Sequence, residues 1–418
     1  MNSKEDFEFL NSEIWIQYSQ NQYRTLEEIK YRMEALGIKQ TDWSEIKNKI
    51  MRLRKTGAVP LFLKSIDKNF WFYPADCIYQ KADKIEKLGN EIYQKIITQS
   101  SFANEFVIDA TIEEAITSAI YEGANSSRAK AQELIESENK PKNRDEWMLY
   151  NNYKAMQWIQ KNQNEPVSLS TTKELHGIVT TNTLSGDDIN FSGRFRNDKV
   201  YVYSSLGEQK HEGVDYNNIE NCLNEAIKFT TENQRYFPKL LKGIILHYFI
   251  SYIHPFFDGN GRTARALFYF KSIKNDLKFI ELLSISAYLK NHGKQYEKSF
   301  EKVIESDFDL TYFIDFNLDA LLEALEKVSK KVDYLLKINI LKKDFNINDN
   351  QVNLLQRLAL HKFRKYDIEK YALIINKSRE IARQELKQLL SMNFLTEHKE
   401  GKKFTYKINL DFLKAKIK

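Results

Sequence analysis

The sequence is poor in cysteine, proline and glycine, and it contains no long hydrophobic run. Its 418 residues include 2 cysteines, 6 prolines and 14 glycines. The two cysteines, Cys77 and Cys222, are too few for a disulfide framework or a cysteine metal cluster, which favours a reducing compartment. The scarcity of helix-breaking residues, together with abundant Leu, Ile, Lys and Glu, favours a mostly helical protein.

The sequence also lacks the features of a membrane span or a secretory signal. The longest apolar run, GIILHYFISYI, is too short to cross a bilayer and contains a histidine. The amino-terminal residues, MNSKEDFEFL, have no apolar core. We therefore expect a cytoplasmic protein that has no membrane partner.

The length and composition predict two or three domains with hydrophobic cores. Hydrophobic residues make up 42% of the chain and charged residues 29%, which is typical of folded proteins. We expect a mixed flank over residues 1–104, a helical domain over 105–330, and a connecting helix with a winged helix-turn-helix over 331–418. The flank contains a predicted hairpin around Asp67 and Lys68. We interpret this region as structural, with docking or substrate positioning as the alternative.

The C-terminal segment differs from the rest in charge. Residues 341–418 contain 18 Lys and Arg against 9 Asp and Glu, a net charge of +9, whereas the whole chain carries +6. Three helical patterns followed by a glycine-containing hairpin predict the winged helix-turn-helix, with Ser378 as an N-cap. The basic residues of its predicted recognition helix and wing are Arg379, Arg383, Lys387, Lys399, Lys402 and Lys403. They indicate binding of DNA, with a protein partner as the alternative.

The densest chemistry of the chain lies in the stretch HPFFDGNGRTAR, between two predicted helices. Its Asp-Gly-Asn-Gly segment, residues 258–261, contains two successive turn pairs. Glycine-rich backbone that leads into a helix presents several N–H groups and the positive end of the helix dipole to one point. Arg262 and Arg265 lie three positions apart on the first turn and can bind phosphate oxygens. The stretch therefore predicts a phosphate site.

Three more residues of this stretch have expected roles. His254 follows a strongly apolar helix, and its pKa near neutrality allows it to accept a proton from a hydroxyl group. Asp258 would repel a phosphate on its own, so its presence indicates a bridging Mg²⁺. Phe256 alternates with His254 and is expected to point inward. A capped helix–loop–helix with a purely structural histidine is the alternative, and the number of reactive groups within twelve residues disfavours it.

The stretch HPFFDGNGRTAR resembles the signature of the Fic family, His-x-Phe-x-Asp/Glu-Gly-Asn-Gly-Arg-x-x-Arg. The resemblance covers roughly residues 105–330 and implies a mainly α fold, with an all-helical Fic core and a small β-hairpin flap. The implied activity is the transfer of AMP from ATP to a Ser, Thr or Tyr hydroxyl of a protein, with release of pyrophosphate. The related Doc-like phosphotransferases carry a basic residue where this chain has Gly261, so that variant is not favoured.

The resemblance also implies roles for individual residues. His254 would be the general base and Asp258 the Mg²⁺ ligand. The phosphates of ATP would be held by the backbone of Gly259, Asn260 and Gly261 and by the side chains of Arg262 and Arg265. Downstream, Asn291 and Tyr296 are candidate nucleoside contacts on a helix, with ordinary helix surface as the alternative.

A flap upstream of the signature would dock the target. It comprises Gly193 and Arg196 followed by a strand of Val200, Tyr201, Val202 and Tyr203. An exposed strand edge can align a target segment by main-chain pairing. An ordinary hairpin is the alternative.

A helix at about residues 110–123 resembles the inhibitory motif of the family, Ser/Thr-x-x-x-Glu-Gly/Asn. Here the motif is formed by Ser118, Glu122 and Gly123, and the first two share a helix face. The resemblance implies that Glu122 pairs with Arg265 and misaligns the α-phosphate of ATP, which would block transfer. A generic acidic helix is the alternative.

The sequence leaves several functions open. The preferred one is an autoinhibited enzyme that transfers AMP to a protein target or to itself. Removal of AMP from a modified protein, with Glu122 positioning the attacking water, and transfer of another nucleotide or phosphate group are alternatives of the same class. A DNA-binding regulator with a Fic sensing core is the alternative of another class. The sequence also leaves open whether the protein forms a homodimer.

Overall fold

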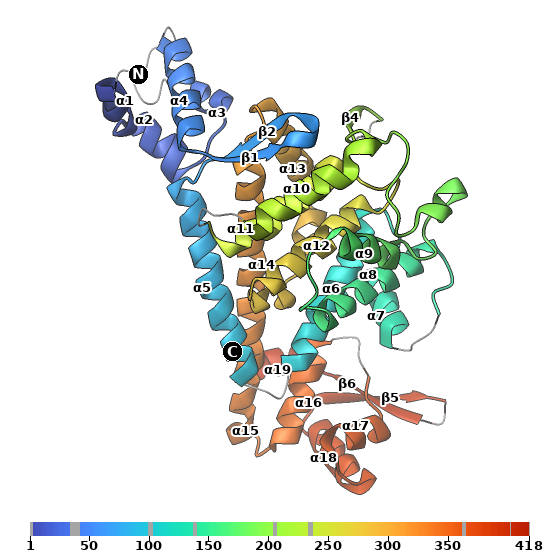
Figure 1. Cartoon of the computed structure of the whole chain (residues 1–418). Coiled ribbons are helices and arrows are strands. Elements are labelled where there is room, and N and C mark those ends of the chain that lie inside the picture. The colour runs from blue at the N-terminus through green and yellow to red at the C-terminus, as the bar shows by residue number, and fades with distance from the viewer. Residues whose placement is uncertain are drawn as a thin grey trace.

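The computed structural model describes residues 3–33, 42–98, 103–136, 140–203, 207–232, 237–361, 365–401 and 403–417. Most of these residues are helical, and the strands among them form two-stranded antiparallel pairs. The mainly helical fold class predicted from the sequence is therefore confirmed. Two long helices, α5 (Asp76–Thr98) and α14 (Thr311–Lys337), pack side by side along the length of the molecule (Figure 1).

The N-terminal segment consists of short helices and a hairpin at one end of these long helices. The hairpin pairs β1 (Val59–Leu63) with β2 (Lys68–Phe72), and Asp67 in its turn has a positive φ of 49°. The predicted hairpin is thus present. The Trp71 carbonyl accepts a hydrogen bond of 2.8 Å from Leu310 N, which fixes the hairpin to the start of α14. The helices before it are α1 (Ser3–Leu10), α2 (Glu13–Trp15), α3 (Leu26–Arg32) and α4 (Trp43–Gly57).

The centre of the molecule is α11 (Lys239–Ile253), which is buried on nearly all sides. It packs closely against α12 (Asn260–Lys274), and the two helices hold the short loop between them. The helices around this pair are α7 (Arg128–Glu136), α8 (Arg144–Lys161), α9 (Leu169–Thr180), α10 (Ile219–Glu232) and α13 (Ser286–Glu305).

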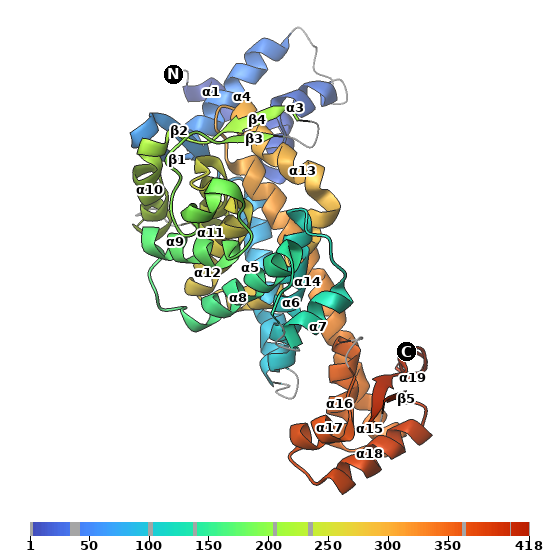
Figure 2. The same ribbon diagram turned by 90° about the vertical axis from the view of Figure 1, so that its right-hand side faces the viewer.

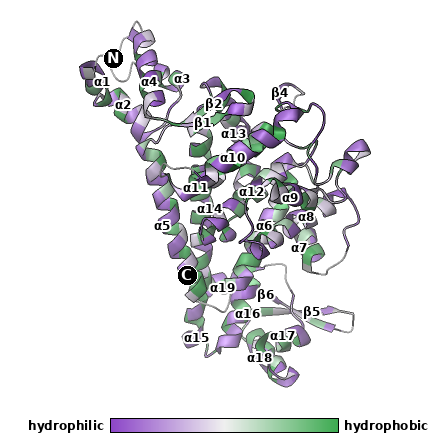
Figure 3. Cartoon of the chain, in the orientation of Figure 1, coloured by the Kyte–Doolittle hydropathy of each residue, from purple (hydrophilic) through white to green (hydrophobic). Residues whose placement is uncertain are grey.

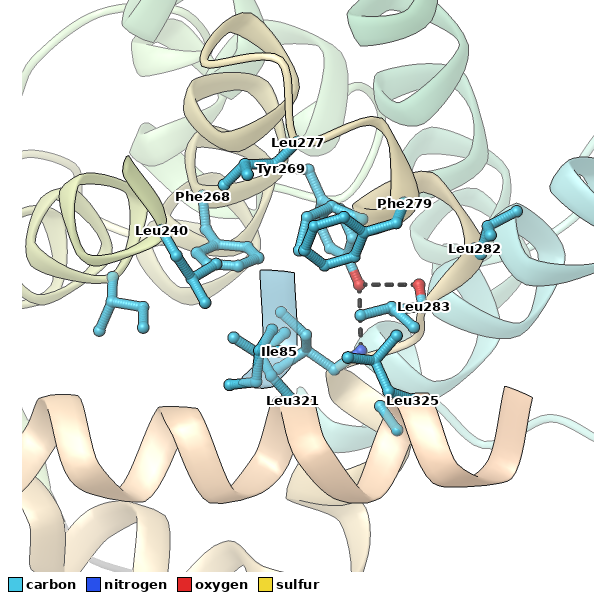
Figure 4. Close-up of a cluster of buried hydrophobic side chains, with 14 of the residues drawn as sticks. Ile85, Leu240, Phe268, Tyr269, Leu277, Phe279, Leu282, Leu283, Leu321 and Leu325 are labelled. Atoms are coloured by element: carbon cyan, nitrogen blue, oxygen red, sulfur yellow. Dashed lines mark hydrogen bonds between the residues drawn. The ribbon is translucent and has the colours of Figure 1, made fainter. Parts of the chain in front are cut away.

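Side chains from four parts of the chain form the core beneath α12 (Figure 4). Ile85 comes from α5, Leu240 from α11, Phe268 from α12 and Leu321 from α14, and all are buried. The hydroxyl of Tyr269 also lies in this core, where it donates to the Leu283 carbonyl at 3.2 Å and accepts from Ile285 N at 3.0 Å. Burial of a tyrosine with both hydrogen bonds made is favourable. The core therefore fixes α12, whose first turn carries the signature arginines, against both long helices.

Helix α6 (Ala103–Tyr121) is longer than the sequence pattern indicated. The expected helix covered about residues 110–123, whereas α6 begins at Ala103 and ends before Glu122. Gly123 follows with a φ of 92°, as expected of a glycine that ends a helix. Hydrophobic and polar residues of α6 are buried alike, including Asp109 and Glu114, so the helix is enclosed by its neighbours on several sides.

The C-terminal segment forms a separate group of elements beyond the end of α14 (Figures 1 and 2). Three helices and a hairpin appear in the predicted order, and Ser378 caps α18 by accepting from Ile381 N at 3.3 Å. A final helix, α19 (Leu410–Lys416), was not predicted. The other elements are α15 (Leu341–Asp344), α16 (Asp349–Leu360), α17 (Ile368–Ile375), α18 (Arg379–Ser391), β5 (Leu395–Glu400) and β6 (Lys403–Ile408). The domain boundaries at 104 and 330 stay predictions.

Hydrophilic and hydrophobic residues are mixed along the long helices α5 and α14 (Figure 3). Such mixing is typical of helices that bury one face and leave the other in water. In the part of the chain that the structure describes, no helix is both long and apolar enough to cross a membrane.

Candidate active site

The loop between α11 and α12 is braced by its own side chains. His254 ends α11 with a φ of 53°, and Gly259 starts α12 with a φ of 81°. The Asn260 side chain accepts from Phe256 N at 3.0 Å and donates to the Phe256 carbonyl at 2.8 Å. Gly259 N donates to the Asp258 carboxylate at 2.6 Å. The short polar side chains therefore fix the loop in one shape.

Phe256 points inward, as expected, and is fully buried. Its ring stacks on His176 of α9 with ring centres 3.5 Å apart. His176 Nδ1 accepts from Gly193 N at 3.0 Å, and Nε2 lies 2.9 Å from the Asp258 carbonyl, to which it donates in the matching tautomer. Burial lowers the pKa of His176 to about 4, which keeps the ring neutral. His176 thus links the flap loop to the signature loop, a role that the sequence analysis missed.

His254 has the properties of a general base. Burial lowers the pKa of His254 to about 4, so the imidazole is neutral at physiological pH. Nδ1 lies 3.2 Å from the Ser251 carbonyl, and only a protonated Nδ1 can donate to that oxygen. The unprotonated Nε2 is then available to accept a proton.

A cavity of about 290 Å³ lies beside His254. Its walls come from the last turn of α11, the first turn of α12, the end of α6, the flap and α13. The predicted site residues that line it are Glu122, Val202, Tyr203, His254, Asn260, Gly261, Arg265 and Tyr296. Those that lie outside its lining are Ser118, Val200, Tyr201, Asp258, Gly259, Arg262 and Asn291. The structure thus brings the predicted base, inhibitory carboxylate and helix start into one cavity.

Arg265 and the end of α6 meet at the wall of this cavity. Arg265 is 3% exposed; its Nη2 donates to Glu122 at 2.8 Å and its Nε to the Ser118 hydroxyl at 3.0 Å. Burial opposes the charge of Arg265, but Glu122 counters it and the pKa of Arg265 rises. A Cβ added at Gly261 would come within 2.3 Å of the Glu122 carboxylate. The carboxylate therefore lies directly against the amino-terminal turn of α12.

Asp258 lies on the other side of the loop, between two arginines. One carboxylate oxygen is 3.5 Å from Arg144 and 3.5 Å from Arg262. Arg262 is buried and donates to the Val179 carbonyl at 2.6 Å, and its Nε has no hydrogen-bond partner among the described residues. Arg262 thus braces the loop from beneath, and a phosphate grip by this side chain stays a prediction. Arg144 was not singled out from the sequence, where it is an ordinary residue at a helix start.

The residues around Asp258 fit a magnesium ion that arrives with a nucleotide. The Asp258 side chain is 41% exposed, so its carboxylate is accessible from solvent. Within the described ranges there is no group of three or more His, Cys, Asp or Glu residues that could hold a metal. Mg²⁺ usually binds through one or two carboxylates together with phosphate oxygens and water. A single exposed carboxylate beside a phosphate site is consistent with that coordination.

The two predicted nucleoside contacts on α13 differ in position. Tyr296 is buried, lines the cavity, and its hydroxyl lies 2.8 Å from His247 Nε2. Asn291 is exposed and precedes His292, where the helix has a non-helical φ of −126°. Tyr296 therefore lies at the cavity wall and Asn291 does not, and both nucleoside contacts stay predictions.

The flap is a short hairpin of β3 (Tyr201–Tyr203) and β4 (Gln209–Glu212). The predicted flap strand comprised residues 200–203; Val200 precedes β3, which contains the other three. Arg196 is buried and its Nε donates to the His254 carbonyl at 2.8 Å, so the base of the flap is fixed to the signature loop. Among the described strands β3 pairs with β4 alone, which leaves its other edge without a strand.

These features form a helix–loop–helix site with a neutral histidine on one side and an exposed carboxylate on the other. Residues 166–270 match the model of the Fic/DOC family. This chain therefore contains a Fic domain, which confirms the resemblance of the signature stretch; the resemblance of the inhibitory motif stays a prediction.

Known proteins agree with this assignment. The chain is 32% identical over 117 residues to the protein adenylyltransferase Fic of Aedes aegypti, a match that spans 27% of this chain and 21% of that protein. A crystal structure of a Fic family protein from Desulfovibrio desulfuricans G20 superimposes with a TM-score of 0.51 at 14% identity, covering 79% of this chain and 96% of that one. The likeness to the Desulfovibrio desulfuricans structure is one of fold alone.

Proposed function

We propose that this chain is an autoinhibited protein adenylyltransferase that uses ATP and Mg²⁺. The observation that carries the proposal is that one cavity is lined by a neutral His254, by Gly261 at the start of α12 and by Arg265. The curated relative from Aedes aegypti, named as a protein adenylyltransferase, supports the reaction class.

The reaction follows from the position of these groups. His254 Nε2 takes the proton of a Ser, Thr or Tyr hydroxyl as its oxygen forms a bond to the α-phosphorus of ATP. The bond from the α-phosphorus to the bridging oxygen breaks, and pyrophosphate leaves. The amide groups at the start of α12 and the charge of Arg265 stabilise the negative charge on the phosphates. Mg²⁺ at Asp258 would neutralise further phosphate charge. The target would pair with the open edge of β3.

Glu122 is the proposed brake. Its carboxylate lies against the first turn of α12 and pairs with Arg265. A bound triphosphate would need both the amide groups of that turn and the charge of Arg265. ATP that bound beside Glu122 would be displaced from the position in line with the target hydroxyl. A misplacement of about 1 Å can cost about 10²-fold in rate.

The experiment that tests the proposal is mass spectrometry of proteins after incubation of the Glu122→Gly variant with ATP, Mg²⁺ and a host lysate. The proposal predicts a mass increase by AMP on a hydroxyl side chain of the variant or of another protein. A set of modified peptides that carry phosphate alone, or no modification at all, would contradict it.

Removal of AMP is the second candidate activity. Glu122 and His254 line the same cavity, so the Glu122 carboxylate could orient a water molecule for attack on an AMP-modified side chain. The two activities predict opposite effects of Glu122→Gly: transfer of AMP increases, and removal of AMP is lost. An AMP-modified protein incubated with both forms of the chain distinguishes them.

The C-terminal elements are proposed to bind DNA. Arg379, Arg383 and Lys387 are all exposed on α18, although Arg379 also pairs with Glu369 at 3.0 Å. Lys399 in the hairpin is exposed as well, and Lys402 lies outside the described residues. A gel shift with random duplex DNA tests this, since phosphate contacts predict binding that weakens as salt rises. The absence of any shift at low salt would favour a protein partner.

A further inference from the structure

Helix α6 carries charged contacts at both of its ends. At the C-terminal end, Ser118 and Glu122 bind Arg265. At the N-terminal end, two acidic side chains of the first two turns bind basic residues of α14 and α16. The five residues of this second contact, which we call the clasp, are Glu105, Asp109, Lys331, Arg357 and His361.

The clasp joins α6 to the C-terminal elements by specific, poorly hydrated contacts. Glu105 lies 3.3 Å from Arg357 and 3.2 Å from His361 Nε2, and Asp109 lies 3.5 Å from His361 Nδ1. Asp109 is 3% exposed and His361 2% exposed, and Asp109 also forms an ion pair with Lys331. Removing one partner of a buried ion pair strongly destabilises the fold, because the other charge is left buried without compensation.

A third anchor holds α6 near its middle. Glu114 is buried and accepts from the Ser286 hydroxyl at 2.6 Å, from Ser286 N at 3.0 Å and from the Ser284 hydroxyl at 2.9 Å. These contacts fix α6 to the start of α13. At 1.5 Å per residue the clasp at Glu105 lies about 13 Å along the helix from Glu114, and Glu122 lies about 12 Å beyond it. A shift at one end of α6 about this anchor therefore moves the other end.

The clasp is also connected to the exposed helix α18. The side chain of Glu385 on α18 accepts from Asn348 at 2.7 Å and from Tyr371 at 2.5 Å, and its carbonyl accepts from Gln351 at 3.1 Å. Asn348 and Gln351 form the capping box of α16, whose other end carries Arg357 and His361. A ligand that moves α18 thus acts on the same helix that holds the clasp.

We propose that the clasp couples the C-terminal elements to the brake, so that displacement of α16 releases Glu122 from Arg265. The inference rests on the proposed function, because it concerns what relieves the inhibition of that site. Coupling is a change in the equilibrium at one site caused by a change at the other, and it acts equally in both directions.

The test uses the full chain with the clasp weakened by single conservative substitutions, Glu105→Gln and His361→Gln. Each is made with Glu122 present and again in the Glu122→Gly background. We expect each to raise AMP transfer roughly fivefold or more while Glu122 is present, and to leave transfer unchanged when Glu122 is absent. The matched control is Asp349→Asn, which removes an exposed ion pair with Lys342 at the other end of α16 and should change nothing.

Hydrogen exchange provides a second measurement that does not require catalysis. Because coupling is reciprocal, ATP with Mg²⁺ should speed amide exchange in residues 349–361 of the Glu122-containing chain, and the clasp variants should speed exchange in residues 118–122. Equal transfer by clasp variants and parent, or an equal rise with and without Glu122, would overturn the coupling. If the Glu122→Gly variant transfers no AMP, the proposed function fails, and hydrogen exchange alone then decides whether the clasp moves α6.

Discussion

The guanidinium of Arg265 is held by Glu122 at 2.8 Å, at the point where α12 begins. Arg265 is buried; Glu122 is the carboxylate that pairs with it, and the Ser118 hydroxyl orients it at 3.0 Å. In the proposed reaction, a phosphate at the start of α12 needs the same guanidinium. We therefore expect Glu122 and the nucleotide to compete for Arg265.

Removing the charge of Glu122 while keeping its shape should strengthen nucleotide binding. We expect Glu122→Gln to bind ATP with Mg²⁺ about tenfold more tightly or better, because a hydrogen bond to a charged group contributes about 1.5–3 kcal/mol. Calorimetric titration measures the Kd of both forms. Glu297→Gln, which removes another carboxylate of the cavity wall, is the control. An unchanged or weaker affinity in Glu122→Gln would contradict the competition.

Ser118 should contribute to the brake indirectly, by orienting Arg265. Ser118→Ala leaves the buried Nε of Arg265 without its partner, which should lower the free energy of unfolding by about 1–3 kcal/mol. AMP transfer should rise, but by less than in Glu122→Gly. Thr117→Ala is the control, since Thr117 bonds Ser284 at 3.0 Å and does not contact Arg265. Denaturant unfolding and transfer assays on both variants test this, and identical behaviour of the two would argue against the role of Ser118.

The pH dependence of transfer should reflect the lowered pKa of His254. In the free enzyme its pKa is about 4, so the base stays unprotonated when the pH falls from 8 to 5. The value of kcat/KM for the Glu122→Gly variant, measured at limiting ATP, should therefore show no acid limb centred near 6.5. An acid limb centred near pH 6.5 would contradict the lowered pKa of His254.

Stability should decrease as the solution becomes acidic, because buried histidines resist protonation. Burial lowers the pKa of His176 to about 4 and that of His247 to about 3, whereas the unfolded chain titrates near 6.5. Between these values the unfolded state binds more protons than the folded state. The free energy of unfolding therefore decreases as the pH is lowered, by about 2 kcal/mol per histidine at pH 5. Denaturant unfolding of His247→Gln should show a smaller loss between pH 7 and 5. The exposed His398→Gln is the control and should keep the full loss.

Features encoded within short stretches of sequence could be predicted. The signature loop places His254, Phe256 and Arg265 by local turns and helix spacing, so their positions agree with expectation. His176 and Arg144 were missed because their roles depend on contacts with Asp258, which is far away in the chain. The spacing of Asn291 and Tyr296 could not show that the helix bends at His292 between them.

Contacts between distant helices also could not be predicted from the sequence. The clasp joins Glu105 to His361 across most of the chain, and each residue alone is an ordinary charged position. The start of α6 at Ala103 was missed because contacts with distant residues hold its first two turns: Glu105 pairs with Arg357 of α16, and Asp109 pairs with Lys331 of α14.

The most direct test of the proposed chemistry compares Glu122→Gly with the double variant Glu122→Gly/His254→Ala. Both are incubated with labelled ATP and Mg²⁺, and AMP incorporation is measured beside the Kd for ATP. We expect the double variant to bind ATP with nearly the same affinity and to incorporate no AMP. Continued incorporation by the double variant would contradict the assignment of His254 as the base.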